Sequence, residues 1–166
     1  KLINVRDEKN MKKLLENKEV NAIKKIIGLQ TGKNYTSTDE LRYGHVLLLT
    51  DQDEDGSHIK GLLFNLFEKM WPSLFYMDGF LQGMLTPVVK AKKGSHTNIF
   101  YSVKDYEKWL DDNNTNGWHS KYYKGLGTST PAEAKEYFTN PKVVTYKAEE
   151  HRDSKAMKLA LLSRFY

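Results

Sequence analysis

The chain has 166 residues, of which 39% are hydrophobic and 28% charged, and this length and composition fit one globular domain with its own core. It contains no cysteine, so disulfides and thiolate zinc sites are excluded, and no apolar run approaches the ~20 residues that a membrane-spanning helix needs. The net charge of +5 allows contact with nucleic acid without establishing it. The first residue is Lys1 rather than a methionine, which predicts a piece of a longer protein.

A helical pattern and a polar loop lead up to the most informative stretch of the chain. Residues 1–6, with the apolar Leu2, Ile3 and Val5, predict a short extended segment. Apolar residues then recur near one face over residues 8–27, which predicts one helix, and Gly28 marks its end. Residues 29–40 are polar and contain glycine, so they predict a loop.

An apolar run, three alternating aspartates and a glycine follow one another between Val46 and Gly56. The run Val46–Leu49 is short and does not alternate, which predicts a strand buried on both faces. From Ser57 onward, apolar residues recur with the spacing of one helical face. A buried strand that leads into a helix places the loop between them at the carboxyl edge of a parallel sheet, where open α/β sheets hold their sites.

The aspartates of this loop are candidate metal ligands. Asp51 and Asp53 are two residues apart, so on an extended backbone their side chains point the same way. Crowded carboxylates are costly to ionise together, and a divalent cation removes that cost. Oxygen ligands at this density suit Mg²⁺ or Ca²⁺ rather than zinc. The simpler interpretation is an acidic turn that caps the following helix and offsets its dipole.

Three kinds of site contain the pattern Asp-x-Asp-x-Asp-Gly. An EF-hand needs a glutamate at the twelfth position, where a count from Asp51 reaches Leu62, and a helix rather than a strand before its loop. An aspartyl-phosphate phosphatase usually has small residues such as Gly-Thr soon after the acids, where this chain has Glu54 and Asp55. The metal site of the TOPRIM domain, found in topoisomerases and primases, fits without exception.

The second half of the chain alternates between short elements and turns. Its predicted elements are a short helix over 72–75, strand-like pieces over 79–84 and 85–91, a return strand over 98–102 that completes a hairpin, a helix over 103–112, a last strand over 143–146 and a last helix over 154–164. Trp118–Tyr123 is a second candidate for a buried strand.

A glycine-containing loop follows that candidate strand. Gly125 and Gly127 allow the backbone to approach a ligand closely, and exposed amides in such a loop suit an anion. Thr130, a proline after it, and Glu133 form the start of a helix with a capping box. Because this is again a strand, a loop and a helix, we expect the loop to lie at the same sheet edge as the aspartates.

Several segments together resemble eukaryotic-type DNA topoisomerase II. Leu49–Leu62 resembles its TOPRIM signature, Lys1–Arg6 resembles its Lys-hydrophobic-hydrophobic-Asn-Val-Arg segment, and Lys121–Thr130 resembles its Lys-Tyr-Tyr-Lys-Gly-Leu-Gly-Thr-Ser-Thr segment. Trp71–Leu74 and Glu133–Phe138 match as well, so the resemblance covers nearly the whole chain. It implies an α/β fold: a TOPRIM (Rossmann-like) parallel sheet flanked by helices, with an inserted β-hairpin.

The same resemblance implies a place in a larger enzyme. Residues 1–166 would be a single TOPRIM domain fragment that lacks the strand bearing the family's glutamate. The enzyme would pass one DNA duplex through another with ATP, using a tyrosine on another domain, and the fragment alone would be inactive. Of two Mg²⁺ ions, Asp51 would bind both and Asp53 would complete the second, while Asp55 would tune the site without direct coordination. Lys1, Asn4 and Lys124 would contact the DNA backbone.

The remaining implications concern partners and alternatives. The partners would be double-stranded DNA and a second copy of the enzyme, which would bind through regions outside this chain. No membrane partner is expected. ATP would bind only in an ATPase domain that this chain does not contain. The expected location is the nucleus, with a viral or cytoplasmic setting as the alternative. Two other functions stay open: a TOPRIM primase or nuclease, against which the Lys121–Thr130 segment argues, and a non-enzymatic Ca²⁺-binding interaction module, against which Leu62 argues.

Overall fold

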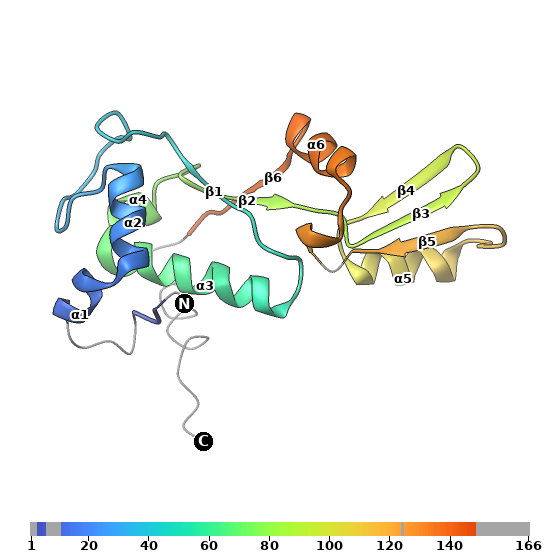
Figure 1. Ribbon diagram of the computed structural model, residues 1–166, viewed down its shortest axis with the longest axis horizontal. Helices are drawn as coiled ribbons and strands as arrows, with labels where there is room; N and C mark the ends of the chain where they lie inside the picture. Colours follow the sequence, from blue (N-terminus) through green and yellow to red (C-terminus); the bar gives the residue numbers. More distant parts are fainter. Residues whose placement is uncertain (1–2, 6–10, 124, 149–166) are drawn as a thin grey trace, which may run out of the picture. The chain divides into compact units, whose positions relative to one another are not determined.

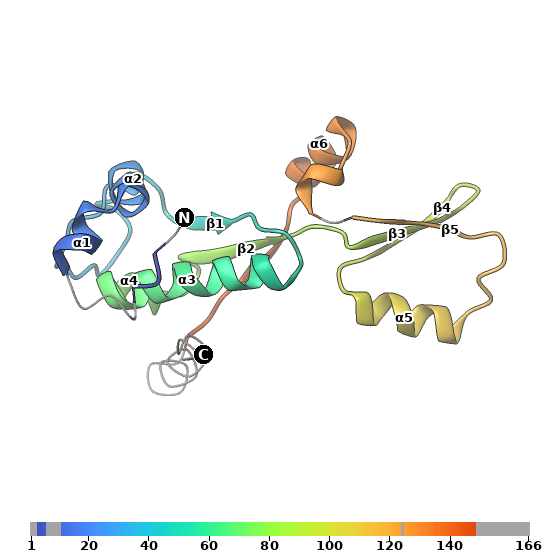
Figure 2. The ribbon, with the colours of Figure 1, turned by 60° about the horizontal axis from the view of Figure 1, so that its bottom comes forward.

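The computed structural model describes residues 3–5, 11–123 and 125–148 (Figures 1 and 2). The chain divides into two compact units. The first unit comprises Lys1–Leu48, His58–Gly83 and Thr145–Tyr166, and the second comprises Leu49–Ser57 and Met84–Val144. The predicted single domain is therefore built from two units, and its membership of a longer enzyme stays a prediction.

Helices and short strands alternate along the described chain. In order they are α1 (Met11–Glu16), α2 (Lys18–Ile27), β1 (Val46–Leu48), α3 (Glu54–Met70), α4 (Pro72–Phe75), β2 (Leu81–Leu85), β3 (Val89–Lys93), β4 (His96–Phe100), α5 (Val103–Asp112), β5 (His119–Tyr122), the 3₁₀ turn η1 (Leu126–Thr128), α6 (Pro131–Thr139) and β6 (Lys142–Thr145). The strands form two three-stranded sheets, with the orders β1-β2-β6 and β4-β3-β5. None of the helices in the described ranges combines the length and hydrophobicity that a bilayer crossing demands.

β1 and β2 are parallel neighbours that α3 connects. Val46 pairs with Leu81 and Leu48 pairs with Gly83, so the predicted strand, helix and parallel strand are confirmed. The expectation that β1 is buried on both faces is wrong in part, because only Leu48 is fully buried and the other two residues are half-buried. An apolar run does not specify which elements cover each face of a strand; among the described strands β1 pairs only with β2, at the edge of its sheet.

The helix predicted over residues 8–27 is two helices in the described part, residues 11–27. Asn17 lies between α1 and α2 with extended backbone, and its side chain accepts a hydrogen bond from the Val20 amide at 3.0 Å. Asparagine is a strong N-cap, and the charged Lys18 and Glu19 stand where the apolar face would continue, so a second helix starts here. The predicted end at Gly28 is confirmed, in the left-handed conformation with φ 88°.

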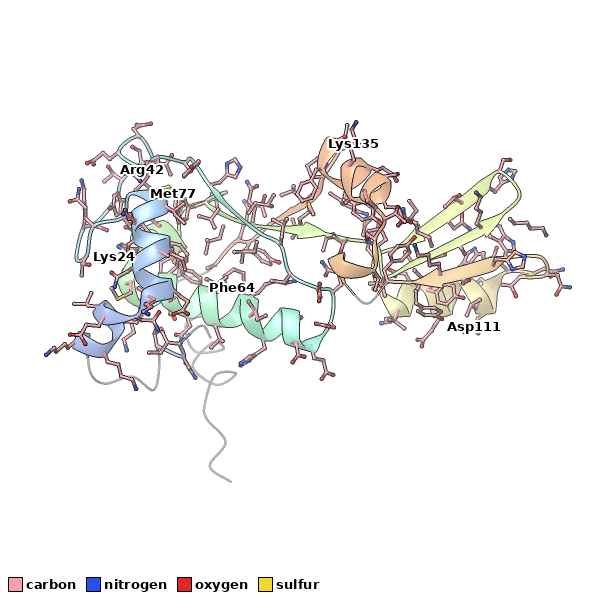
Figure 3. All side chains as sticks on the ribbon, in the orientation of Figure 1. Lys24, Arg42, Phe64, Met77, Asp111 and Lys135 are labelled. Carbon is pink, nitrogen blue, oxygen red and sulfur yellow. The ribbon has the colours of Figure 1, made fainter. Side chains whose placement is uncertain are left out.

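Large aromatic side chains form the core of the first unit. Phe67 and Trp71 of the α3 region and Phe80 before β2 are almost fully buried, and the centroid of the Phe67 ring lies 5.6 and 5.7 Å from those of the other two. The Trp71 indole donates a hydrogen bond to the Gln30 carbonyl (2.9 Å), which attaches the polar loop to the core. Phe64, labelled in Figure 3, lies on α3 and packs against the same core.

The second unit is built on the antiparallel sheet β4-β3-β5, and α5 runs along one face of it (Figure 2). Val89 and Ala91 of β3 form a buried cluster with Tyr106 of α5. Successive residues of a strand point to opposite faces, so Lys90 faces away from α5. The predicted hairpin is confirmed as β3 and β4, which are antiparallel neighbours.

Two predicted strands exist but are exposed in the structure, and burial was expected only for the first of them. The strand expected over Trp118–Tyr123 exists as β5, but the expectation that it is buried is wrong: all its residues are exposed, and it pairs antiparallel with β3 at the edge of the second sheet. The apolar residues that suggested burial, Trp118 and Tyr123, flank β5 rather than belong to it. The last strand, β6, is also exposed. The helix predicted over 154–164 lies outside the described residues.

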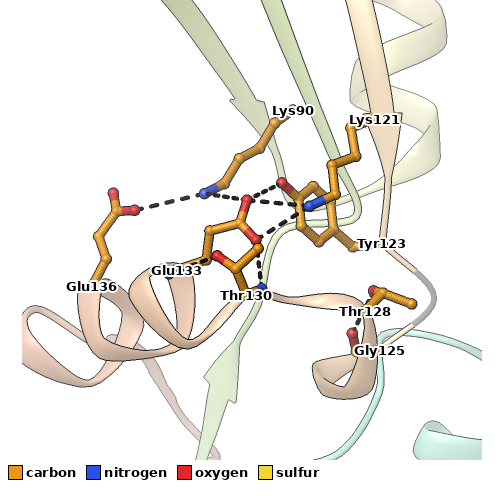
Figure 4. A network of polar contacts seen from close by, with 8 residues as sticks. All are labelled: Lys90, Lys121, Tyr123, Gly125, Thr128, Thr130, Glu133 and Glu136. Carbon is orange, nitrogen blue, oxygen red and sulfur yellow. Dashed lines mark hydrogen bonds and ion pairs between the residues drawn. The ribbon is translucent and has the colours of Figure 1, made fainter.

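One carboxylate attaches α6 to the sheet of the second unit (Figure 4). Glu133 accepts hydrogen bonds from the Tyr123 hydroxyl and from the Thr130 amide, the latter at 2.8 Å. The ammonium groups of Lys121 and Lys90 lie 3.2 and 3.8 Å from its oxygens. The Thr130 hydroxyl accepts a hydrogen bond from the Glu133 amide (3.3 Å), so the predicted capping box is confirmed. Because the Glu133 side chain is only 19% exposed, these partners replace most of its water.

The contacts lower the pKa of Glu133 and raise the pKa of Tyr123, so both groups keep the protonation state that their hydrogen bond needs. The hydrogen bond from Tyr123, followed by that from the Thr130 backbone, lowers the pKa of Glu133 from its ordinary 4.5 to about 2. Burial, followed by the hydrogen bond to Glu133, raises the pKa of Tyr123 above its ordinary value of 10.0. At neutral pH the carboxylate is therefore ionised and accepts, while the phenol keeps the proton that it donates.

The aromatic core predicts a large effect of truncation. Phe67→Ala should lower the free energy of unfolding by about 3–5 kcal/mol, because it removes a fully buried ring and leaves a cavity. The matched control is Ile26→Ala, also on a helix of the first unit but 59% exposed, which should change it by less than about 0.5 kcal/mol. Urea denaturation followed by circular dichroism measures both, and equal effects would contradict the assigned core.

The low pKa of Glu133 predicts a dependence of stability on pH. A depressed carboxylate pKa stabilises the folded state above the unfolded pKa, so this contribution is complete above about pH 4.5 and is lost as the pH falls toward about 2. Glu133→Gln keeps the capping box and removes the titration. The unfolding free energy of the wild type should therefore fall more steeply over this range than that of the variant, as measured by denaturant titrations at several pH values; parallel curves would contradict it.

Candidate metal and phosphate site

Asp53 caps helix α3. Its side-chain Oδ1 accepts a hydrogen bond from the Gly56 amide (2.8 Å), and its carbonyl accepts one from the Ser57 amide (3.0 Å). The helix starts at Glu54, three residues earlier than the Ser57 start expected from the apolar spacing. The simpler interpretation of the acidic turn is thus confirmed for one oxygen of Asp53. Among the described residues its other oxygen accepts no hydrogen bond, so this carboxylate could still bind a cation.

The glycine after the aspartates is required by space. Gly56 is buried, and an added Cβ would overlap the backbone carbonyl of Asp51. Its φ angle is not in the left-handed region, so close approach rather than backbone conformation demands glycine here. The first turn of α3 therefore packs directly on the residue that the metal hypothesis puts at its centre.

Gly125 contacts the other side of Asp51. Its φ is 104°, a conformation that side chains rarely adopt, and an added Cβ would overlap the carboxylate group of Asp51. The Gly125 carbonyl accepts hydrogen bonds from the Thr128 amide (3.3 Å) and hydroxyl (2.9 Å), which hold the loop in this conformation. The glycine loop lies beside Asp51, but the expectation that both lie at the same sheet edge is wrong, because β5, the strand before the loop, belongs to the antiparallel sheet and β1 to the other sheet.

The surrounding contacts fix the aspartate loop in the second unit. The Gln52 side-chain amide donates a hydrogen bond to the Met84 carbonyl (3.1 Å), which ties the loop to the chain at β2. The Thr50 hydroxyl is buried without a hydrogen-bond partner in the described residues. Asp55 is exposed in the first turn of α3.

These residues fit part of a magnesium site. Asp51 and Asp53 supply the hard oxygen donors that Mg²⁺ prefers, and because Gly125 has no side chain, the Asp51 carboxylate can occupy the place that a Cβ would take. Within the described ranges, however, His, Cys, Asp and Glu side chains do not gather in any group of three or more that could hold a metal ion. A complete site therefore needs further ligands, from water, from DNA phosphate or from protein outside the described residues.

The predicted DNA contacts are placed only in part. Asn4 lies in the first unit, where its side-chain oxygen accepts a hydrogen bond from the Asn65 amide group (3.3 Å). It is half-buried, so part of its side chain remains accessible. Lys1 and Lys124 lie outside the described residues. The roles of all three, and those of Asp51, Asp53 and Asp55, stay predictions.

Sequence reasoning missed the residues that hold the glycine loop in place. Tyr123 and Glu133 were visible only as a strand end and a capping residue, although they bond to each other across the loop. Lys90 stands between two buried residues of β3, and its side chain is 12% exposed. A lysine between two inward-facing apolar residues of a strand ordinarily indicates a solvent-facing side, so this pattern could not reveal that α6 covers Lys90.

Comparisons with known proteins agree with these features. A family model described as the C-terminal associated domain of TOPRIM matches residues 84–164. DNA topoisomerase 2 of Plasmodium falciparum is 51% identical over 143 residues, which cover 86% of this chain and 10% of that protein. DNA topoisomerase 2-alpha of Rattus norvegicus is 48% identical over 166 residues, covering 96% of this chain and 11% of that protein. The chain thus spans about a tenth of the length of these relatives.

A solved structure extends the similarity to the fold. The crystal structure of the Plasmodium falciparum topoisomerase II DNA-binding, cleavage and re-ligation domain matches with a TM-score of 0.90 and 44% identity, over 99% of this chain and 23% of that one. The α/β architecture and the expected TOPRIM fold are therefore supported over the whole chain. By sequence and by structure, the chain is homologous to the DNA cleavage and re-ligation region of type II DNA topoisomerases.

Proposed function

We propose that this chain is the metal-binding part of the DNA cleavage and re-ligation core of a type II DNA topoisomerase. The observation that carries the proposal is the contact between Asp51 and Gly125, which brings an acidic loop and a glycine loop together from distant parts of the chain. The homology favours this function over a primase, a nuclease or a calcium-binding module, since each named relative is a DNA topoisomerase 2. ATP hydrolysis, the attacking tyrosine and the dimer contacts would belong to other parts of the enzyme.

The aspartates would hold magnesium against a DNA phosphate. When bound, Mg²⁺ supplies Lewis-acid stabilisation of the charge on the scissile phosphate and of the departing 3′ oxygen. Asp51 and Asp53 are the residues that would hold it, and the capping bond to the Gly56 amide fixes the Asp53 carboxylate in one orientation. Asp55, on the first helical turn, would add negative charge without direct coordination.

The basic and polar residues would position the DNA. Lys1, Asn4 and Lys124 are proposed to contact phosphates, which gives affinity and register without reading the base sequence. The net charge of +5 supports this proposal, because basic side chains outnumber acidic ones although the proposed metal site is itself acidic. Double-stranded DNA is therefore the proposed substrate, and nuclear location stays a prediction.

Asp53→Asn separates metal binding from helix capping. Asparagine caps as well as aspartate, so the melting temperature of the full-length enzyme should stay within about 2 °C, while loss of the negative charge should raise the Mg²⁺ concentration for half-maximal DNA cleavage at least about tenfold. The measurement is a magnesium titration of plasmid linearisation. Asp105→Asn, an equal charge change in the first turn of α5, is the matched control and should leave the titration unchanged. Superimposable titrations for all three proteins would leave Asp53 only its capping role.

Gly125→Ala tests the contact that carries the proposal. The new Cβ would overlap the Asp51 carboxylate, so single-turnover DNA cleavage should fall by about a hundredfold. Gly94→Ala is the matched control: Gly94 lies in the same unit with φ 57° and open space around it, so the variant carries a backbone penalty alone. The control should keep its cleavage rate, and equal losses in the two variants would show that conformational strain, not the contact, matters.

A further inference from the structure

Glu133 spans the glycine loop from one end to the other (Figure 4). Tyr123 immediately precedes the loop and Thr130 immediately follows it, and both donate hydrogen bonds to the same carboxylate. The loop between them carries Gly125, whose backbone contacts the Asp51 carboxylate. A bond that closes the two ends of a short segment restricts what the segment between them can do.

The carboxylate is itself held from several sides. Lys121 on β5 and Lys90 on β3 lie 3.2 and 3.8 Å from it, and Lys90 also lies 3.7 Å from Glu136 on the next turn of α6. The ammonium groups of Lys121 and Lys90 stand over the ring of Tyr123, at 4.5 and 5.6 Å from its centroid. Both partners of the Tyr123–Glu133 hydrogen bond are thus fixed by the sheet.

Glu133 makes one hydrogen bond, with the Tyr123 hydroxyl, that a capping box does not require. The reciprocal bonds between Thr130 and Glu133 complete the capping box, and neither involves Tyr123. The Tyr123 hydroxyl could donate to water if capping were the only purpose, yet it is buried against the carboxylate and its ring is only 7% exposed. The additional bond therefore connects the end of β5 to the start of α6 across the loop.

We propose that Tyr123 and Glu133 are positioning residues that hold the Gly125 loop against the Asp51 carboxylate. In this proposal they act through the loop backbone rather than by direct contact with metal or DNA. This inference rests on the proposed function, because the consequence for DNA cleavage follows only if Asp51 and the loop form the cleavage site.

The test uses variants of the full-length protein. Tyr123→Phe removes one hydroxyl and keeps the ring, and Tyr106→Phe is its matched control, because Tyr106 in the same unit donates a comparable hydrogen bond to the Ser120 hydroxyl (2.8 Å). Tyr123→Phe should raise amide exchange over residues 125–130 about tenfold, as expected when a hydrogen bond to a charged group is lost. Tyr106→Phe should not. Hydrogen–deuterium exchange with mass spectrometry measures this without reference to activity.

Cleavage kinetics then connect the loop to function. At saturating DNA, the single-turnover cleavage rate of Tyr123→Phe should fall about tenfold, while DNA affinity stays within about twofold, because a misplaced loop affects reacting geometry more than phosphate binding. Glu133→Gln keeps one acceptor oxygen for the Thr130 amide, and its side-chain NH2 group can donate to the Tyr123 hydroxyl, so the link across the loop persists. Both measurements should therefore stay closer to the wild type than in Glu133→Ala, which should resemble Tyr123→Phe.

One outcome would overturn the positioning role of Tyr123 and Glu133, and a different outcome would overturn the proposed function. Unchanged exchange over residues 125–130 in Tyr123→Phe overturns the positioning inference, whatever the cleavage rate. Raised exchange with cleavage that is insensitive to Tyr123→Phe and also to Asp53→Asn supports the positioning role and overturns the proposed function instead.

Discussion

The contact between the Gly125 backbone and the Asp51 carboxylate constrains both segments of the second unit. It forces a glycine at 125, where a side chain would occupy the carboxylate's place, and it leaves Asp51 packed between this loop and the first turn of α3 at Gly56. Asp51 is half-buried there, whereas Asp53 and Asp55 are exposed. Carboxylates brought close together repel each other, and a divalent cation relieves that repulsion.

Much of the fold could be predicted because local chemistry and tertiary structure agree. The parallel β1–α3–β2 unit follows from an apolar run, a turn and a helical stripe, and the start of α6 follows from its capping residues. The exposure of β5 could not be predicted, since burial of a strand depends on which neighbours cover it. The division of the first helix at Asn17 was missed because a single capping side chain marks the start of α2 within a stretch that is otherwise rich in helix-forming residues.

The candidate site, too, could be predicted only in part from the sequence. The sequence indicated that Asp51 and Asp53 belong together and that the glycine loop lies near them, because each follows a strand and precedes a helix. It also offered capping as an alternative to metal binding, and Asp53 is compatible with both roles, since one carboxylate oxygen caps α3 and the other does not. The Tyr123–Glu133 bond and the partners of Lys90 join residues from three elements, and no spacing rule encodes such a meeting.

The boundaries of the second unit bear on how this region could be inherited or transplanted. The family match begins at residue 84, but the unit also contains Leu49–Ser57, which the chain reaches before it builds most of α3. A cut at residue 84 would therefore keep Gly125 and separate it from the carboxylate for which it makes room. The two loops can work together only when the intervening α3 and β2 travel with them, so the smallest exchangeable module is larger than the segment that sequence similarity delimits.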